Sequence, residues 1–531
     1  MDVEFLLNGE VVRLGDVAAT RTLLDWLREE RGLAGTKEGC NEGDCGACSV
    51  IVTDDRGPRA LNACILLLPQ LHGAAVRTIE GIAGPGGEPH PVQTAMVEHH
   101  GSQCGFCTPG FVVTMAAAHM AGRRDHDDQL AGCLCRCTGY APIVRAAEAV
   151  EDAPVPGWMI DDPIAGAAPS RARPGTSAPG PAGGARGSGR GVAGMAEGPG
   201  DPTAHDGPRS RAEAPAAPSR AGVGADWGRR DPVAGTGASD AAGGPGGGWV
   251  RPSSSDALAA WLVDHPDATL VAGATDVGLW VTKGMRDLGE VAFLAGCRDL
   301  RGVDVGAEEV RIGAMASVET VREAMAPLHP ALGEVLRRYG SVQVRHAATI
   351  GGNIANGSPI GDSPPLLIAL GATLHLRRGE ERRSMPLEKF FLDYGRQDRQ
   401  PGEFVEAITV PRQQDRLRAW KLSKRFDQDI SAVCGAFRIT MEDGAVAEAR
   451  IAFGGMAATP RRAAAAEAAL TGAPWDEAAL RRAAEALGED FAPISDMRAS
   501  AEYRLEAARG MLTRCWLADR GAAISVLEVT A

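Results

Sequence analysis

The chain has 531 residues, 44% of them hydrophobic, and a formal net charge of −13 at pH 7. The negative charge argues against nucleic acid binding, because phosphates require a basic surface. The N-terminus shows no basic and apolar signal sequence, and apolar stretches such as residues 111–118 are too short to span a bilayer. We therefore expect a cytoplasmic protein without membrane contact, divided into three or four domains at about 150 residues each.

Residues 1–82 predict a small β-grasp ferredoxin domain. Asn8-Gly9 joins two short strands, because this dipeptide favours a tight hairpin turn. Leucines recur with helical spacing over residues 22–28, and the β-branched run 49–53 predicts another strand. Between them lies a glycine-rich loop, residues 35–46, whose backbone N–H groups are able to approach metal-bound sulfur closely.

This domain carries a first set of four cysteines, three with the spacing C-x4-C-x2-C and a fourth further along. The set is Cys40, Cys45, Cys48 and Cys64. Without export, cysteines at ligand spacing indicate a metal site rather than disulfides. Zinc sites usually pair two C-x2-C knuckles, so the asymmetric spacing favours a plant-type 2Fe–2S cluster over structural zinc.

Residues 83–160 predict a small helical bundle around a second set of cysteines. Pro91 and Pro109 suit the first turns of two helices, and residues 141–150 form a third. His99-His100 closes the first of these helices and needs no ligand role there. The second cysteine set is Cys104, Cys107, Cys135 and Cys137.

The second set lies just before the second and third helices, where the positive end of the helix dipole favours thiolate over thiol. Its C-x2-C and C-x-C spacing fits a 2Fe–2S cluster and also fits zinc, although the neighbouring first set favours iron–sulfur. Cys133 is interpreted as a free thiol beside a complete ligand set. Cys297, Cys434 and Cys515 lie in apolar contexts and are predicted to be core residues.

Residues 161–248 differ in composition from the rest of the chain. Ala, Gly, Pro, Arg and Ser dominate this stretch, and it lacks Leu and Phe. It offers too little apolar surface to offset the entropy of ordering, so we expect a disordered linker.

Residues 249–412 predict a mixed α/β domain with two glycine-rich turns. One lies at residues 271–276 and the other at residues 349–353, each after a strand-like run. Together they are typical of backbone nests for a pyrophosphate, but they do not form the G-x-G-x-x-G dinucleotide fingerprint. A flavin is chemically attractive, since it couples one-electron clusters to a two-electron acceptor, but ordinary tight turns remain an alternative.

Residues 413–531 predict an antiparallel sheet followed by helices. The sheet pattern covers residues 430–455 and turns at Glu442-Asp443-Gly444. Alanine-rich helices are predicted over residues 461–470, 476–487 and 499–519.

Several long motifs resemble those of a known family. Residues 38–48, 103–110 and 135–140 resemble the iron–sulfur motifs of molybdenum hydroxylases, residues 349–362 resemble their flavin domain, and residues 454–463 resemble their C-terminal flavoprotein domain. Iron–sulfur and flavin modules in this order most resemble the small subunit of bacterial xanthine dehydrogenases. The resemblance covers nearly everything except the linker.

The resemblance implies an electron-transfer role with two 2Fe–2S clusters and FAD. The molybdopterin centre would lie on a separate large subunit, in a heterodimer or a dimer of heterodimers, so this chain would hold no residue catalysing hydroxylation. Electrons would pass from molybdenum to the helical-domain cluster, with Gln103 near the pterin, then to the ferredoxin cluster, FAD and finally NAD. The substrate would be hypoxanthine or xanthine, with an aldehyde or another N-heterocycle as alternatives.

The resemblance also implies a set of flavin contacts. Two segments would hold the FAD pyrophosphate and adenosine side, Asp362 and Lys421 would add further contacts, and Tyr339 would lean on the isoalloxazine ring. The full set is Val271, Ala272, Gly273, Ala274, Thr275, Asp276, Tyr339, Thr349, Gly351, Gly352, Asn353, Asp362 and Lys421. Residues 427–429 would influence whether NAD or oxygen takes the electrons.

The chain departs from the family pattern at three places. Cys133 and His346 each stand where the family usually has Asn, and the long linker is unusual. None of these changes removes a predicted cluster ligand. A function of another class, a zinc-stabilised scaffold that is not an enzyme, is the remaining alternative.

Overall fold

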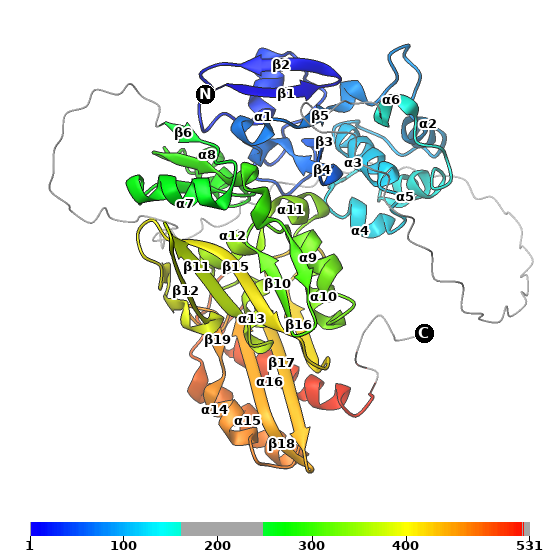
Figure 1. The fold of residues 1–531 in the computed structure, drawn as a ribbon. Coiled ribbons are helices and arrows are strands. Elements are labelled where there is room, and N and C mark those ends of the chain that lie inside the picture. Colours follow the sequence, from blue (N-terminus) through cyan, green and yellow to red (C-terminus); the bar gives the residue numbers. More distant parts are fainter. Residues whose placement is uncertain (1, 161–247, 523, 525–531) are drawn as a thin grey trace, which may run out of the picture. The chain divides into compact units, whose positions relative to one another are not determined.

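The computed structural model describes residues 2–160, 248–522 and 524. The predicted linker, residues 161–248, lies outside this range except for Gly248. None of the described helices has both the length and the apolar character that a membrane crossing requires. The fold class is multidomain α+β, as predicted (Figure 1).

The ferredoxin domain is a five-stranded mixed sheet in the order β2-β1-β5-β3-β4. Its strands are β1 (Val3–Leu7), β2 (Glu10–Leu14), β3 (Ser49–Asp54), β4 (Gly57–Asn62) and β5 (Ala75–Arg77). β1 and β2 form the predicted hairpin, and Asn8 and Gly9 both adopt the positive φ that such a turn requires. The short helix α1 (Leu23–Asp25) continues into one wider π-helical stretch, η1 (Trp26–Glu30), and both bury leucines against the sheet.

The helical domain packs around the apolar helix α3. Its helices are α2 (Pro91–Glu98), α3 (Thr108–Met120), α4 (His126–Leu130), α5 (Ala141–Glu148) and α6 (Gly157–Ile160). α2, α3 and α5 each carry proline in the first turn, where no backbone N–H is needed. α3 is buried almost all round and contacts β3 and β4 of the ferredoxin domain.

The flavin domain contains a small parallel sheet and a larger antiparallel sheet. The parallel sheet has the order β6-β8-β7 and the larger one has the order β12-β11-β15-β10-β9. Their strands are β6 (Trp249–Val250), β7 (Thr269–Val271), β8 (Val291–Phe293), β9 (Val303–Val305), β10 (Glu309–Gly313), β11 (Thr373–Arg378), β12 (Glu381–Pro386) and β15 (Phe404–Pro411). A separate hairpin pairs β13 (Phe391–Asp393) with β14 (Arg396–Gln397).

Helices connect these strands and supply the loops of the candidate site. They are α7 (Ser255–Asp264), α8 (Val277–Thr282), α9 (Val318–Met325), α10 (Pro330–Arg337), α11 (Val342–Ala347), α12 (Ile350–Asn356) and α13 (Ser363–Ala369).

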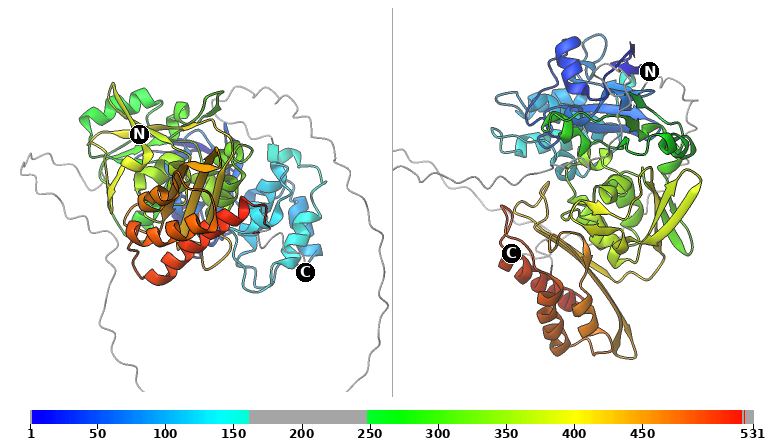
Figure 2. Two further views of the ribbon diagram at one scale, coloured as in Figure 1. Left: turned by 90° about the horizontal axis from the view of Figure 1, so that it is seen from below. Right: turned by 90° about the vertical axis from the view of Figure 1, so that its left-hand side faces the viewer.

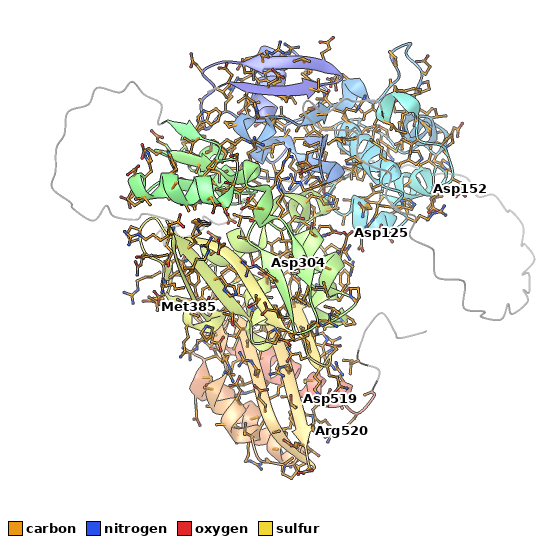
Figure 3. All side chains as sticks on the ribbon, viewed as in Figure 1. Asp125, Asp152, Asp304, Met385, Asp519 and Arg520 are labelled. Carbon is orange, nitrogen blue, oxygen red and sulfur yellow. The ribbon has the colours of Figure 1, made fainter. Side chains whose placement is uncertain are left out.

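The C-terminal domain is a four-stranded antiparallel sheet covered by helices. The strands are β16 (Leu417–Leu422), β17 (Val433–Glu442), β18 (Ala445–Gly454) and β19 (Arg461–Arg462), and the helices are α14 (Ala464–Leu470), α15 (Glu477–Asp490) and α16 (Ala501–Ala518). The helices cover one face of β17 and β18, while α13 packs on the other face (Figure 2). At the end of α16, Trp475 donates to Asp519, which Figure 3 labels beside Arg520.

Two predictions of local structure are wrong. Residues 349–356 do not turn after a strand: Thr349 caps the helix α12, and the helix α11 precedes it. The predicted helix at residues 461–470 begins only at Ala464, because Arg461 and Arg462 pair with β18 as an edge strand. The other predicted hairpins and helices are confirmed to within a few residues.

Candidate functional site

The first set of cysteines lies on one loop and one short turn of the ferredoxin domain. Cys40 and Cys45 lie in the glycine-rich loop, Cys48 precedes β3, and Cys64 lies in the turn η2 (Ala63–Ile65). All four thiols are free of disulfides, and Cys48 and Cys64 are buried. The side chains form two hydrogen-bonded pairs, Cys40 with Cys45 and Cys48 with Cys64.

Backbone N–H groups point at the sulfur atoms of the first pair. Cys45 N and Asp44 N donate to Cys40 Sγ at 3.3 and 3.4 Å, and Cys40 N donates to Cys45 Sγ at 3.3 Å. The Cys45 thiol and these N–H groups lower the pKa of Cys40 to about 5 against the opposing effect of burial. These contacts therefore favour a thiolate at Cys40, the form in which cysteine binds metal.

Glycines give this loop its shape. Gly43 and Gly46 adopt positive φ, and a Cβ on Gly39 would lie 2.7 Å from Cys45 Sγ. Only residues without a side chain allow the backbone to pass this close to the sulfurs. The donor set therefore fits a sulfur-ligated cluster of small size.

The second set of cysteines brackets the N-terminal ends of α3 and α5. Cys107 is the N-cap of α3, and the set again forms two pairs, Cys104 with Cys137 and Cys107 with Cys135. Burial raises the pKa of Cys107 to about 12, with a further contribution from its hydrogen bond to Cys135. Cys104 and Cys137 are exposed, in contrast to the first set.

The loop of Cys135 and Cys137 has its own hydrogen bonds. Thr138 Oγ1 lies 3.1 Å from Cys135 Sγ, and Tyr140 Oη accepts from Cys135 N at 3.0 Å. Among the described residues, no three His, Cys, Asp or Glu side chains converge on one point as the ligands of a single ion would. Four cysteines at each site supply the number of protein ligands that a 2Fe–2S cluster takes.

The two cysteine loops contact each other directly. Leu134 N donates to Cys45 O at 3.0 Å, so one hydrogen bond connects the backbone of the first loop to the residue before Cys135. A Cβ on Gly46 would lie 2.2 Å from Gly132 O, and one on Gly110 would lie 2.3 Å from Gly46 O. Glycine at these positions brings the two sites together.

The predicted flavin segments also lie side by side. A Cβ on Gly273 would lie 1.8 Å from Ala347 O, so the loop after β7 packs against the chain leading into α12. Asn356 Nδ2 donates to Asp276 Oδ1 at 3.2 Å and joins the two segments. Burial raises the pKa of Asp276, and the hydrogen bond from Asn356 opposes this effect.

Tyr339 extends this site through the side chain of Asn353. Asn353 Nδ2 donates to Tyr339 Oη at 3.1 Å, and Asn353 Oδ1 accepts from Ser363 Oγ at 2.5 Å. Burial raises the pKa of Tyr339, and the negative charges of Asp276 and Asp362 raise it further, so the phenol stays neutral.

Asp362 and Lys421 form a buried ion pair beside this chain of contacts. Lys421 Nζ lies 2.7 Å from Asp362 Oδ2 and also donates to Arg338 O at 3.1 Å. Ser431 Oγ donates to Asp362 Oδ1 at 2.5 Å. Arg338 in turn stacks on the exposed ring of Phe426, with Cζ 4.4 Å from the ring centroid.

Comparison with known proteins assigns these regions to domain families. Residues 6–68 match the 2Fe-2S iron-sulfur cluster binding domain, and residues 78–148 match the [2Fe-2S] binding domain. Residues 242–413 match the FAD binding domain in molybdopterin dehydrogenase, and residues 418–518 match the CO dehydrogenase flavoprotein C-terminal domain.

The chain carries the iron–sulfur and flavin domains of the molybdenum hydroxylases.

Relatives with this architecture act on different substrates. The chain is 31% identical to nicotinate hydroxylase hnxS of Emericella nidulans over 97% of its length, and 31% identical to xanthine dehydrogenase of Drosophila subobscura over 91%. It spans only 40% and 36% of the length of these relatives. Carbon monoxide dehydrogenase from Hydrogenophaga pseudoflava is similar in structure, with a TM-score of 0.48 and 29% identity over 50% of this chain and 95% of that one.

Within this molybdenum hydroxylase architecture, the structure brings the predicted flavin residues into one connected region. The predicted residues of 271–276 and 349–353, with Tyr339, Asp362 and Lys421, are joined by the contacts above. Sequence reasoning missed the residues that complete these contacts, namely Asn356, Ser363, Ser431 and Arg338. Ser363 directly follows the family motif and could have been included, whereas nothing in the sequence pointed to Ser431.

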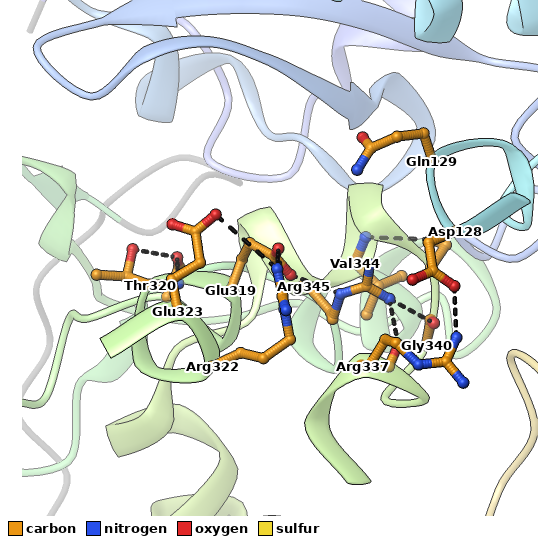
Figure 4. Close-up of polar contacts among 12 residues, drawn as sticks. Asp128, Gln129, Glu319, Thr320, Arg322, Glu323, Arg337, Gly340, Val344 and Arg345 are labelled. Carbon is orange, nitrogen blue, oxygen red and sulfur yellow. Dashed lines mark hydrogen bonds and ion pairs between the residues drawn. The ribbon is translucent and has the colours of Figure 1, made fainter. Parts of the chain in front are cut away.

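Sequence reasoning also missed the contacts that tie the flavin domain to the iron–sulfur domains. Lys283 Nζ, just after α8, donates to Cys40 O at 2.6 Å. Arg337 pairs with Asp128 of the helical domain, and within the flavin domain Arg345 Nε lies 2.7 Å from Glu319 Oε2 (Figure 4). Burial opposes ionisation of Glu319, but Arg322 and Arg345 together hold its pKa down to about 2.

Proposed function

We propose that this chain is the electron-transfer subunit of a xanthine dehydrogenase. With its groups bound, the complex would pass electrons from a molybdopterin centre on a large partner subunit through the helical-domain cluster, the ferredoxin cluster and FAD to NAD, as hypoxanthine and xanthine are oxidised. Cys40, Cys45, Cys48 and Cys64 would hold one cluster, and Cys104, Cys107, Cys135 and Cys137 the other.

The observation that carries this proposal is that hydrogen bonds connect the three regions in the order that electron transfer would require. The hydrogen bond from Leu134 N to Cys45 O connects the second cysteine loop to the first. The bond from Lys283 Nζ to Cys40 O connects the first loop to α8, whose N-terminal end follows the predicted pyrophosphate loop. The chain's own residues thus hold neighbouring sites at short separation without an intervening domain.

The surface around the second site supports docking of a partner there. Cys104, Cys137 and Gln103 are exposed, and Phe106 and Leu134 expose 49% and 41% of their surface beside them. Exposed apolar side chains around a polar centre are typical of protein interfaces. We propose that the molybdopterin-bearing subunit covers this face, in a heterodimer or a dimer of heterodimers.

The flavin region supplies binding and orientation. The backbone of residues 271–276 and 349–353 would hold the pyrophosphate, and Tyr339 is kept neutral beside the proposed ring site. The Asp362–Lys421 pair offers fixed, buried charges of both signs. Phe426, next to residues 427–429, is exposed, which supports a role of this segment in access of NAD or oxygen.

The test is co-expression with the large subunit, followed by analysis of iron, acid-labile sulfide and flavin and by assay with xanthine. We expect about four irons and one flavin per chain, two electron paramagnetic resonance signals, and NAD reduction that depends on xanthine. Activity with nicotinate but not xanthine would favour the N-heterocycle alternative, since nicotinate hydroxylase is an equally similar relative. Zinc without iron or sulfide would favour the scaffold and exclude the electron-transfer function.

A further inference from the structure

Gln343, on α11 of the flavin domain, reaches between the two iron–sulfur domains. Its side chain is buried, with 1% of the residue exposed. Its Nε2 atom lies 3.2 Å from Ser49 Oγ of the ferredoxin domain and 3.1 Å from Thr114 Oγ1 of the helical domain. It also lies 3.6 Å from Cys133 Sγ. One amide group from the third domain therefore contacts both of the other two.

Each partner of Gln343 belongs to the support of one cysteine loop. Ser49 Oγ donates to Gly46 O at 2.7 Å and so holds the turn between Cys45 and Cys48. Thr114 Oγ1 lies 3.3 Å from the sulfur of Cys133, two residues before Cys135. The amide thus adds a second connection between the loops beside the Leu134–Cys45 hydrogen bond.

The oxygen of the same amide is not satisfied within the described structure. Gln343 Oε1 is buried and has no hydrogen-bond partner among the described residues. A Cβ on Gly132 would lie 2.1 Å from Oε1, so the Cys133 loop packs directly against it. The neighbouring Cys133 offers only a weak S–H donor, and a buried acceptor without a donor costs about 1–3 kcal/mol.

The helix that carries Gln343 is fixed at both ends. Ser341 caps its N-terminus, and Arg345 donates to Glu319 and to the carbonyl of Arg337 at 2.7 Å each (Figure 4). Arg337 itself pairs with Asp128 of the helical domain. The amide is therefore presented from a rigid support rather than from a mobile loop.

We propose that Gln343 is a positioning residue whose hydrogen bonds fix the two cysteine loops relative to each other. We also propose that Cys133 leaves this set of hydrogen bonds incomplete, because Gln343 Oε1 has no donor. The inference rests on the proposed function, because register matters only if both loops hold clusters. An Asn at position 133 would offer an amide N–H donor at this junction in place of the buried thiol.

Hydrogen exchange of the full chain tests whether Gln343 stabilises the junction of the two cysteine loops, without any assay of activity. The amide of Leu134 reports the junction, because it is bonded to Cys45 O. We expect Gln343→Leu to speed its exchange about tenfold, and Cys133→Asn to slow it about tenfold. Gln129→Leu is the control, since Gln129 is also buried in the helical domain, at 5% exposed, and its side chain donates to Asp125 of that same domain.

A second, spectroscopic experiment tests whether the Gln343 hydrogen bonds affect the distance between the two clusters. The magnetic interaction between two reduced clusters falls steeply with their separation, so Gln343→Leu is expected to change the splitting of the resonance signals at unchanged iron content. Gln343→Glu retains the shape of the side chain but has an oxygen in place of the Nε2 donor. It is the variant to use if Gln343→Leu fails to fold. Unchanged exchange and splitting in Gln343→Leu or Gln343→Glu, with iron present, would overturn the inference. A wild-type chain without iron would instead refute the proposed function, while its Leu134 exchange would still report on the junction.

Discussion

The two cysteine sites contain the same number of thiols but differ in exposure: the first has two buried and two partly buried thiols, and the second has two exposed, one partly buried and one buried. Cys48 and Cys64 of the first site expose 3% and 1% of their surface, whereas Cys104 and Cys137 of the second site are exposed. The first site is enclosed by its own sheet and by α8 of the flavin domain, where Gly278 packs against Ile65. At the second site the cysteines lie at the start of α3 and in the loop before α5, beside the exposed side chains of Phe106 and Leu134.

This difference indicates two roles for chemically similar centres. A buried site with neighbours on both sides suits an internal relay, protected from solvent and from other oxidants. A site open on one side suits exchange of electrons with a separate protein. Stability and electron transfer should therefore respond differently to equivalent changes at the two sites.

The largest expected effect is the loss of a ligand from each site. We expect Cys64→Ala and Cys137→Ala each to remove about two irons per chain. Only Cys64→Ala should also lower the free energy of unfolding of the surrounding domain, by on the order of 3 kcal/mol. The reason is that Cys64 lies in the ferredoxin core and a metal site there contributes to folding. Iron analysis and denaturant unfolding measure both effects. Equal destabilisation by the two variants would contradict the comparison.

A smaller effect is expected from matched glycine substitutions. Gly46 and Gly105 both adopt positive φ in a cysteine loop, but a Cβ on Gly46 would lie 2.2 Å from Gly132 O, while one on Gly105 meets nothing within 4 Å. Gly105→Ala should cost about 1 kcal/mol, from backbone conformation alone. Gly46→Ala adds a clash with backbone and should cost about 3 kcal/mol. Thermal unfolding with iron analysis separates the two, and similar costs would show that the loops are not packed tightly.

Much of the fold could be predicted because local signals decide it. Asn8-Gly9 specifies the first hairpin, and proline in the first turn marks α2, α3 and α5. The prediction fails at α12, where Thr349 caps a helix whose second and third residues are glycines. There Gly351 packs against Ala314, the residue after β10, a contact that the local sequence does not contain.

The candidate site likewise contains features that local sequence predicts and features that depend on residues far apart in the chain. The spacing of the cysteines is a local signal, and the structure places each set of four together, while their roles as ligands remain predictions. The contacts of Gln343 with Ser49 and Thr114 join residues 294 and 229 positions apart, so no local pattern predicts them. Similarly, Cys297, Cys434 and Cys515 are buried as predicted, because apolar neighbours in the sequence suffice for that.

Acid provides a further test through two histidines, His90, which is buried, and His346, which is partly buried. His90 caps α2 of the helical domain, and His346 on α11 lies against β4 of the ferredoxin domain. Burial lowers the pKa of each to about 4, with a contribution from nearby positive charge. Since the unfolded value is about 6.5, both favour folding above that pH, and this stability is lost as the pH falls toward 4.

We expect a loss on the order of 1–2 kcal/mol per histidine between pH 7.5 and pH 5. Thermal unfolding of wild type, His90→Asn and His346→Asn over this range measures it, and each variant should flatten the curve. Glu319, whose pKa is held down to about 2, titrates below this window. A curve as steep in both variants as in wild type would assign the loss to other groups.

The smallest expected effect concerns the charge that only the first site receives from the flavin domain. Lys283 donates to Cys40 O at 2.6 Å and lies 4.0 Å from Glu42, and its side chain remains 46% exposed. A positive charge stabilises the reduced, more negative form of a cluster, so Lys283→Gln should lower the reduction potential of the first cluster. Solvent screens this charge, which limits the shift to on the order of tens of millivolts. Potentiometric titration followed by resonance spectroscopy should show the shift in the first signal and none in the second, with Lys389→Gln in the flavin domain as control. Equal shifts in both signals would mean that the charge of Lys283 acts on both clusters alike. That result would contradict a distinct electrostatic environment at the first site.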